Sequence, residues 1–284
     1  MSAQGAGEGV YWLGDPASRD PAIVSEPVAC LARLADLAEY LPPAFCLTAP
    51  PFEALPDGSL GAGAAAIARM YAQLARVASQ PDPAVVVRSA LVGSSRPAAS
   101  WIPAPWTFVN VAGPEVLLEA VTECVAPYVS DRARAYRAAH SGCSAEVMLA
   151  VMVQHFIAAD VCSTVLAGPA SEDVMIRSRW GLLELTGAGG WDTTVLRRSD
   201  LAVLQRTTAD KRRMTVAGDG GVIQVDVPSA KRQVACLADA QARQLAELAA
   251  GIQERVGGPV EAEIALQEDR MYLLWCTPGP PGQR

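Results

Sequence analysis

The sequence predicts an α+β fold built as two lobes. Helical and strand-like patterns both recur along the chain, and from Val147 onward the strand-like runs become more frequent. Mixed elements of this kind favour the α+β class. At 284 residues the chain suits one large domain or two intimate lobes better than independent modules. We expect a single domain over residues 1–284, with lobes at about 1–145 and 146–278 and a tail at 279–284.

The first half of the chain predicts helices around two short strands. Apolar residues at helical spacing from Val28 to Tyr40 indicate a helix that Pro42 and Pro43 end. Three prolines and a glycine make the segment 90–106 loop-like. The strands are expected at 45–48 and 85–88, and the further helices at 64–78, 114–125 and 131–140.

The second half predicts mostly strands with one long helix. The strand-like runs cover 148–153, 163–166, 173–176, 194–196, 221–225, 260–265 and 271–276. The helix is expected at 236–256. No internal repeat interrupts this order.

Composition excludes several classes of function. The net charge of −7, without any Lys/Arg-rich run, makes nucleic acid an unlikely partner, because its binding rests on cationic contacts to phosphate. No apolar run is long enough to cross a bilayer, and the first residues lack the pattern of a signal peptide. Two histidines and seven scattered cysteines give no zinc spacing. We therefore expect a cytoplasmic protein that contacts no membrane.

Eight short strings occur in the order found in one known family. They are RS at 88–89, TFVNV at 107–111, SDRARAYR at 130–137, VMVQ at 151–154, WGLLE at 180–184, DK at 210–211, GGPVEAE at 257–263 and MYLL at 271–274. In this order they resemble the ATP-grasp nucleotide-binding domain that opens phosphoenolpyruvate synthase, pyruvate phosphate dikinase and rifampin phosphotransferase. The resemblance runs from about Val24 to Pro278.

This resemblance implies a two-lobed fold that grips ATP, with Mg²⁺, in the cleft between its lobes. In active relatives the β-phosphoryl group of ATP moves to a histidine of a separate swivelling domain. Nothing in this chain resembles the TGGxxxH motif of that domain. We therefore expect the phosphohistidine and phosphoenolpyruvate/pyruvate domains to be absent from this chain.

Arg88 and Glu263 are the residues to which the resemblance gives phosphate and metal contacts. Arg88 corresponds to a phosphate-gripping arginine, and its planar guanidinium suits two-point contact to phosphate oxygens. Glu263 corresponds to a metal-binding glutamate, a hard ligand suited to Mg²⁺. The ordinary alternatives are a rim arginine paired with a carboxylate and a glutamate on a solvated strand face.

Gln154, Phe156 and Ile157 correspond to the hinge whose backbone reads adenine, so changes of side chain are tolerated there. His155, within the same hinge, is expected to be a packed or surface residue. Glu184 corresponds to the glutamate of the family's WGLGE string and is a further nucleotide contact. No catalytic residue is assigned.

The positions that handle phosphate in the family are altered in this chain. The family's VGGKGANL becomes VSEPVACL at 24–31, which removes the adjacent pair of glycines and the phosphate-binding lysine. The covering loop SFAGQ becomes SWIPA at 100–104, where Pro103 has no N–H to offer. Ser94 and Ser95 stand where the family has an acidic pair, and Arg177 stands where it has an acidic strand residue. The family's LLQxR is replaced by LWCT at 274–277.

These losses favour a catalytically degenerate ATP-grasp module that acts by binding a ligand or a partner, and they count against both ATP and Mg²⁺ as ligands. The alternative is the ATP-binding half of a split ATP-dependent phosphotransferase, whose phosphohistidine domain is a separate chain. In that version Arg177, Arg179, Lys211, Arg212 or Arg213 take over the phosphate contacts. A repurposed ligase is a third hypothesis. The sequence does not indicate an acceptor substrate, the identity of a partner or an oligomeric state.

Overall fold

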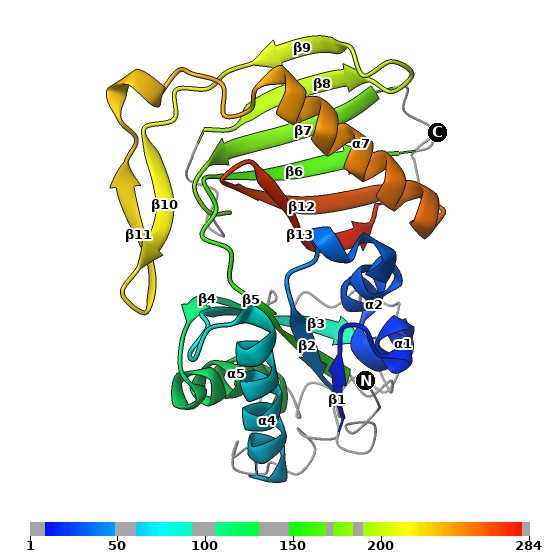
Figure 1. The fold of residues 1–284 in the computed structure, drawn as a ribbon, viewed down its shortest axis with the longest axis vertical. Helices are drawn as coiled ribbons and strands as arrows, with labels where there is room; N and C mark the ends of the chain where they lie inside the picture. The colour runs from blue at the N-terminus through cyan, green and yellow to red at the C-terminus, as the bar shows by residue number, and fades with distance from the viewer. Residues whose placement is uncertain are drawn as a thin grey trace. The chain divides into compact units, whose positions relative to one another are not determined.

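A computed structural model of this chain describes residues 9–48, 61–92, 106–130, 148–168, 173–183 and 190–279. These residues divide into two compact units (Figure 1). The first unit lies within 1–32 and 43–156, and the second within 33–42 and 157–284. Each unit has its own sheet and its own helices.

The first unit contains a five-stranded antiparallel sheet in the order β1-β2-β5-β3-β4. Its strands are β1 (Val10–Trp12), β2 (Ala44–Leu47), β3 (Val85–Val92), β4 (Thr107–Val111) and β5 (Met148–His155). Its helices are the 3₁₀ helix η1 (Pro16–Arg19), α1 (Pro21–Val24), α2 (Glu26–Arg33), α4 (Gly61–Ala78) and α5 (Pro114–Val129).

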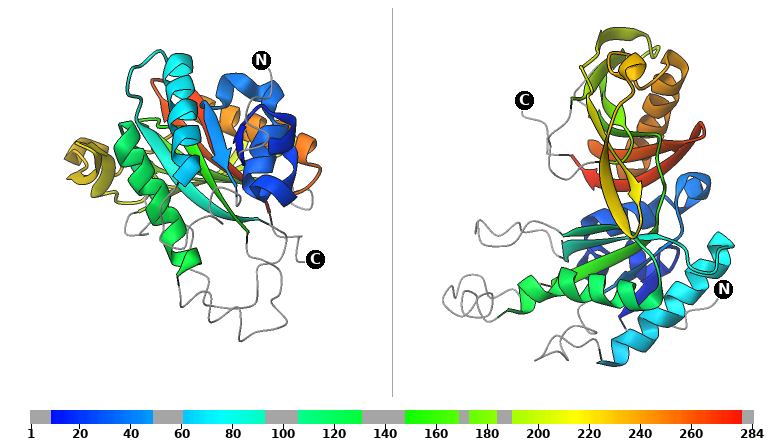
Figure 2. Two further views of the ribbon diagram at one scale, coloured as in Figure 1. Left: turned by 90° about the horizontal axis from the view of Figure 1, so that it is seen from below. Right: turned by 90° about the vertical axis from the view of Figure 1, so that its left-hand side faces the viewer.

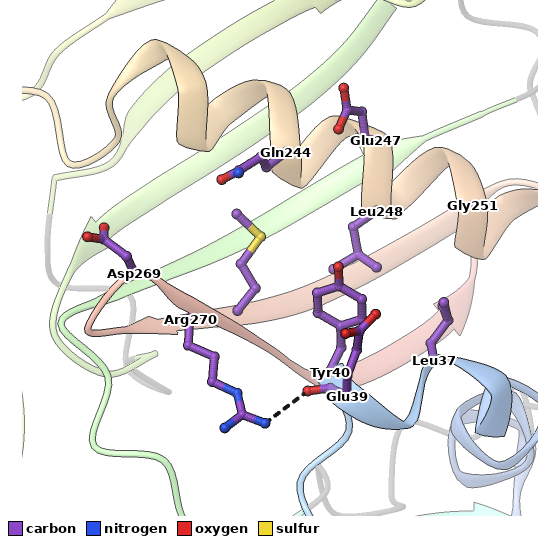
Figure 3. A pocket seen from close by; sticks show the side chains of 10 residues that line it. Leu37, Glu39, Tyr40, Gln244, Glu247, Leu248, Gly251, Asp269 and Arg270 are labelled. Atoms are coloured by element: carbon purple, nitrogen blue, oxygen red, sulfur yellow. Dashed lines mark hydrogen bonds between the residues drawn. The ribbon is translucent and has the colours of Figure 1, made fainter.

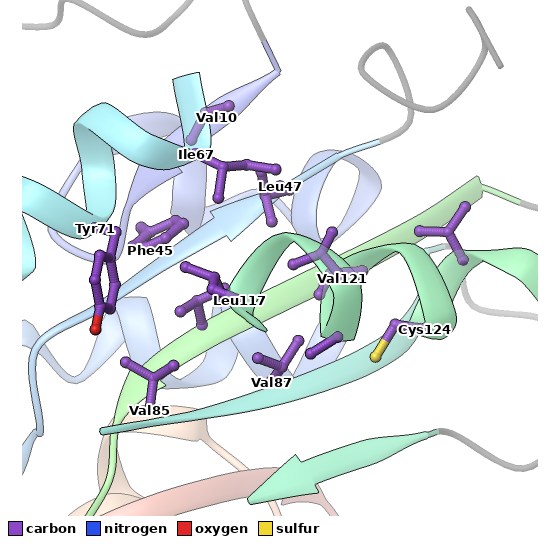
Figure 4. Packing of buried hydrophobic residues seen from close by; sticks show 14 of the residues in the cluster. Val10, Phe45, Leu47, Ile67, Tyr71, Val85, Val87, Leu117, Val121 and Cys124 are labelled. Carbon is purple, nitrogen blue, oxygen red and sulfur yellow. The ribbon is translucent and has the colours of Figure 1, made fainter. Parts of the chain in front are cut away.

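Alternation along the strands gives this sheet one strongly apolar face. Val85 and Val87 on β3 and Val151 and Val153 on β5 are fully buried on that face, where α4 and α5 cover them (Figures 2 and 4). The helices contribute a further set of buried side chains: Ile67, Tyr71, Leu74, Leu117 and Val121. Burial of this apolar surface stabilises the unit and fixes the register of its strands.

The second unit contains a six-stranded antiparallel sheet in the order β13-β12-β6-β7-β8-β9 and a separate hairpin, β10-β11. Its strands are β6 (Val161–Ala167), β7 (Asp173–Trp180), β8 (Asp192–Arg197), β9 (Val203–Thr207), β10 (Arg213–Gly218), β11 (Gly221–Asp226), β12 (Val260–Gln267) and β13 (Arg270–Pro278). Its helices are the 3₁₀ helices η2 (Ala35–Tyr40) and η3 (Ser229–Lys231), and α7 (Asp239–Val256).

Helix α7 lies across one face of the six-stranded sheet (Figure 1). Its buried residues recur every three or four positions, as an amphipathic helix requires. They are Ala242, Leu245, Ala246, Leu248, Ala249, Ile252 and Gln253. The helix ends at Gly257, whose φ of +75° is a left-handed conformation that glycine adopts without a Cβ clash. The sheet therefore has a covered face and a second face without α7.

The predicted α+β class is confirmed, and the structure differs from the expected elements in several places. The helix expected at 28–40 is α2 followed by η2, because Leu37 leaves helical geometry (φ −95°, ψ 32°). Strands β1, β4, β9 and β10 were not expected, and the helix expected at 131–140 lies outside the described residues. The first unit ends at Phe156 instead of near 145, because β5 pairs with β2 and β3. The cleft that the resemblance implies stays a prediction.

Among the described residues, no helix is both long and apolar enough to span a membrane.

Candidate functional site

The face of the six-stranded sheet that lies away from α7 is called the open face below. It carries a row of side chains that crosses all six strands. Each member of the row is paired with the next one in register. Directly opposed residues of antiparallel strands point to the same face, so the six side chains lie side by side. In strand order they are Thr207, Thr193, Arg177, Thr164, Glu263 and Trp275.

This row lies on the face opposite α7. Ile264 on β12, Val165 on β6 and Ile176 on β7 are fully buried, and they alternate with Glu263, Thr164 and Arg177 along their strands. Because α7 packs on these same strands, the buried set faces the helix and the polar row faces away from it. The sequence did not reveal this row, since it depends on which strands pair.

Arg177 is held at the centre of the row by an aromatic ring. Its guanidinium carbon lies 5.1 Å from the centroid of the Trp191 ring, within the range of cation–π attraction. Arg179, two positions further along β7, lies 5.2 Å from the same centroid. The Arg177 side chain is exposed, whereas Arg179 is buried. Of these two arginines, Arg177 is therefore the one that this face presents to a ligand.

Glu263 is half-buried beside a β-bulge, where the pairing of β12 with β13 shifts register. Glu261 lies two positions away on the same face and is exposed. Among the described residues, no group of three or more His, Cys, Asp or Glu side chains could hold a metal ion. The donor set fits Mg²⁺, which is commonly bound through one or two carboxylates, with substrate phosphates and water completing its shell.

An apolar pair lies next to this polar row. Leu166 on β6 and Met175 on β7 oppose each other in register on the open face. Their side chains are 37% and 40% exposed. The open face thus combines apolar surface with a few placed polar groups, which is the usual composition of a ligand-binding surface.

The predicted nucleotide contacts Arg88 and Gln154 share one face of the first sheet. Arg88 is opposite Met152, and Gln154 is opposite Val86, so both point away from the apolar face of β3. Arg88 is half-buried, and Gln154 is only 1% exposed. Among the described residues, the buried Gln154 amide nitrogen has no hydrogen-bond partner.

The predicted hinge has part of its backbone already engaged. The Phe156 N–H donates to the Ala84 carbonyl at 2.9 Å, and the Ala159 N–H donates to the Ile157 carbonyl at 2.9 Å. Within the described part of the chain, the Ile157 N–H donates to no backbone carbonyl. Glu184 lies outside the described residues, as do Ser94, Ser95 and the segment 100–104.

Lys211, one of the cations that the alternative hypothesis assigned to phosphate, has a structural role instead. Its Nζ lies 2.6 Å from the Asp192 carboxylate, and both side chains are 2% exposed. The same carboxylate accepts hydrogen bonds from the backbone N–H groups of Ala209 and Cys236, at 2.9 and 2.8 Å. This buried ion pair and its two hydrogen bonds join β8 to the segments that flank the β10-β11 hairpin. Lys211 is therefore not available to a phosphate.

Arg212 and Arg213, from the same hypothesis, lie at the surface. Arg212 donates to the Asp210 carboxylate at 2.7 Å, and Arg213 lies 3.5 Å from the Asp226 carboxylate. Both arginine side chains are more than half exposed, so these ion pairs are weak.

A pocket of about 540 Å³ lies on the α7 side of the second unit (Figure 3). Side chains of η2, α7 and the β12-β13 hairpin line it, with Tyr40 and Leu248 facing each other. Its charged lining is Glu39, Glu247, Asp269 and Arg270. Arg270 donates to the Glu39 carbonyl at 3.3 Å and lies over the Tyr272 ring. Three carboxylates against one cation disfavour a phosphate ligand.

Comparison with known proteins identifies the class to which this fold and these residues belong. Residues 63–281 match the family described as pyruvate phosphate dikinase, AMP/ATP-binding domain. This chain belongs to that family. The resemblance inferred from the short strings is thereby confirmed.

Three relatives illustrate the match. A probable phosphoenolpyruvate synthase of Methanothermobacter thermautotrophicus is 29% identical over 217 residues, covering 75% of this chain and 32% of the relative. A rifampicin phosphotransferase of Streptomyces sviceus is 30% identical over 232 residues, covering 79% and 26%. The phosphoenolpyruvate synthase of Escherichia coli is 31% identical over 233 residues, covering 75% and 29%.

The chain thus matches less than a third of the length of each of these relatives. Among solved structures, a D-alanine–D-alanine ligase of Bacillus anthracis aligns over 94% of this chain and 59% of its own, with a TM-score of 0.40 and 10% identity. That likeness is too distant to carry an argument.

Proposed function

We propose that this chain binds an adenine nucleotide together with Mg²⁺ and works as a binding module, through its ligand or a protein partner. Membership of an AMP/ATP-binding family supports the nucleotide. The observation that carries the proposal is the row on the second sheet, in which Arg177, Thr164 and Glu263 stand side by side on three adjacent strands. A cation, a hydroxyl and a carboxylate are the groups that a metal-chelated phosphate requires.

The metal is assigned to Glu263, with Glu261 as a second carboxylate on the same face. A bound Mg²⁺ would neutralise phosphate charge and draw the phosphate chain toward β12. Arg88 on the first sheet and the backbone of Gln154, Phe156 and Ile157 are retained as proposed nucleotide contacts. Because the Phe156 N–H is engaged by Ala84, adenine readout falls to the Ile157 N–H.

The segment 24–31 supports binding without efficient phosphoryl transfer. Val28 to Ala32 of α2 are buried in the first unit, and Ser25 is also buried. Glu26 is the charged side chain of this segment, so it offers no cation where the family has a lysine. Removal of one well-placed transition-state contact costs about 2.7–4 kcal/mol. A transfer rate at least 100-fold below that of a complete relative follows from the missing lysine alone.

Thermal unfolding of the full chain tests nucleotide binding. Millimolar MgATP should raise the unfolding midpoint by mass action, and Glu263→Gln should remove most of the dependence on Mg²⁺. Arg88→Ala should reduce the shift further. The absence of any shift with MgATP, ATP alone or AMP would exclude the proposed nucleotide site.

The second candidate is the ATP-binding half of a split phosphotransferase, and Arg177 is the observation that favours it. An arginine on the Glu263 face is able to bind phosphate in place of the family's lysine. Incubation with β-labelled ATP and a purified phosphohistidine domain of a phosphoenolpyruvate synthase separates the two functions. Label on the histidine supports transfer, whereas nucleotide binding without label supports the binding module.

A further inference from the structure

We infer that Arg177, fixed over Trp191, is a polyphosphate contact of the second unit, and that it selects ligands by the number of their phosphate groups. The inference rests on the proposed nucleotide function and names the part of the ligand that this face recognises. It also singles out Arg177 from the five cations that the split-phosphotransferase hypothesis assigned to phosphate.

The register fixes the separation of the two charged groups. Arg177 and Glu263 lie on β7 and β12, with Thr164 of β6 between them in the same row. Adjacent strands are about 4.8 Å apart, so the Cβ atoms of Arg177 and Glu263 are about 10 Å apart. The long arginine side chain and a metal ion on the glutamate leave a gap that a chain of two or three phosphates spans. A single phosphate is too short to contact both Arg177 and a metal ion on Glu263.

Arg177 is suited to an anion because no carboxylate among the described residues neutralises its charge. No carboxylate in the described part of the chain forms an ion pair with Arg177, and its side chain is exposed. The Trp191 ring holds the guanidinium without consuming its N–H donors, since cation–π attraction uses the face of the ring. An arginine held in place in this way loses little conformational freedom when it binds phosphate.

The flanking hydroxyls complete the contact. Thr164 and Thr193 stand on either side of Arg177 in the row, and both are half-buried. Neither hydroxyl has a hydrogen-bond partner among the residues that the structure describes. Each can donate to a phosphate oxygen while the guanidinium provides its two-point contact.

The acidic pocket on the α7 side is less suited to phosphate than the open face. Its carboxylates repel phosphate, and its arginine is already engaged by a backbone carbonyl. Of the two faces of this sheet, the open face is therefore the one that accepts a polyphosphate.

Equilibrium binding to the full chain tests the inference, with MgATP, MgADP, AMP, adenosine and magnesium tripolyphosphate as separate ligands. For Arg177→Gln we expect MgATP affinity to fall at least 10-fold, MgADP affinity to fall less, and adenosine affinity to stay within twofold of wild type. Arg177→Lys keeps the charge but loses the planar guanidinium, so its MgATP affinity should lie between those of the wild type and Arg177→Gln. Arg197→Gln is the matched control, because it removes an exposed arginine of the same sheet that is paired with Asp200.

The outcomes separate this inference from the proposed function. Equal MgATP affinity in wild type and Arg177→Gln overturns the inference, and so does an equal loss for adenosine and MgATP. If the wild type binds no nucleoside or nucleotide, the proposed function is wrong, but tripolyphosphate binding that Arg177→Gln removes still supports the polyphosphate contact. Absence of tripolyphosphate binding in that case overturns both. If Arg177→Gln does not fold, the Arg177→Lys comparison carries the test.

Discussion

Lys211 and Arg177 are two cations of the same unit with opposite surroundings. Lys211 is buried, and its ammonium group donates to the Asp192 carboxylate and to the Ala209 carbonyl. Arg177 is exposed on the other face of the sheet and is held by an aromatic ring. A buried charge requires a partner, whereas an exposed charge can be kept for a ligand. The comparison gives Lys211 a structural role and is consistent with the binding role proposed for Arg177.

The largest expected effect comes from removal of the buried Asp192–Lys211 ion pair. Lys211→Met leaves the Asp192 carboxylate buried without its cation, which should cost about 3–5 kcal/mol of unfolding free energy. Urea denaturation measures this change. A loss below about 1 kcal/mol would show that the Asp192–Lys211 pair is not a structural requirement.

A pair of leucine variants sharpens the contrast between the two faces. Leu245→Ala empties a fully buried site under α7 and should cost about 2–5 kcal/mol. Leu166→Ala on the open face removes a side chain that is 37% exposed, and it should cost about 1 kcal/mol or less. Denaturation midpoints measured side by side provide the comparison. Equal losses would mean that the open face is also part of a packed core.

A smaller effect is expected from one hydroxyl of the open face. Thr164→Val keeps a β-branched side chain of similar shape on β6, so stability should change by less than about 0.5 kcal/mol. Removal of a hydrogen bond to phosphate should weaken MgATP binding about 3- to 10-fold. Calorimetric titration measures the affinity. An unchanged affinity would remove Thr164 from the binding surface.

The smallest expected effect concerns His155, in the first unit. Burial lowers the pKa of His155, so the folded state disfavours its charged form. Stability is therefore complete above the unfolded pKa of about 6.5 and declines as the pH falls below it. His155→Phe should flatten this decline between about pH 6.5 and pH 5. Denaturation at a series of pH values reports the slope, and an identical slope in the variant would contradict the assignment.

The sequence predicted elements whose patterns are local. Helix α4 and strands β2 and β12 follow from apolar periodicity, and the order of the short strings was enough to identify the family. The break at Leu37 was missed because apolar spacing continues through it. Residues 33–42 belong to the second unit, which only tertiary contacts reveal.

The candidate site was harder to predict because it depends on strand pairing. Glu263 is far in the sequence from Arg177 and Thr164, and only the pairing of β12 with β6 brings it into their row. Lys211 was grouped with the phosphate-binding candidates because its partner Asp192 lies in β8, well before it in the sequence. A cation therefore cannot be assigned to a ligand or to the core from its position in the sequence alone.

Mapping the metal of a bound nucleotide tests the central claim most directly. Fe²⁺ replaces Mg²⁺ in the ATP complex, and ascorbate with peroxide then cuts the backbone close to the bound iron. The account predicts cuts near Glu263 on β12 and Thr164 on β6, and their disappearance in Glu263→Gln. Cuts at the pocket lined by η2 and α7, or cuts that persist in Glu263→Gln, would contradict it.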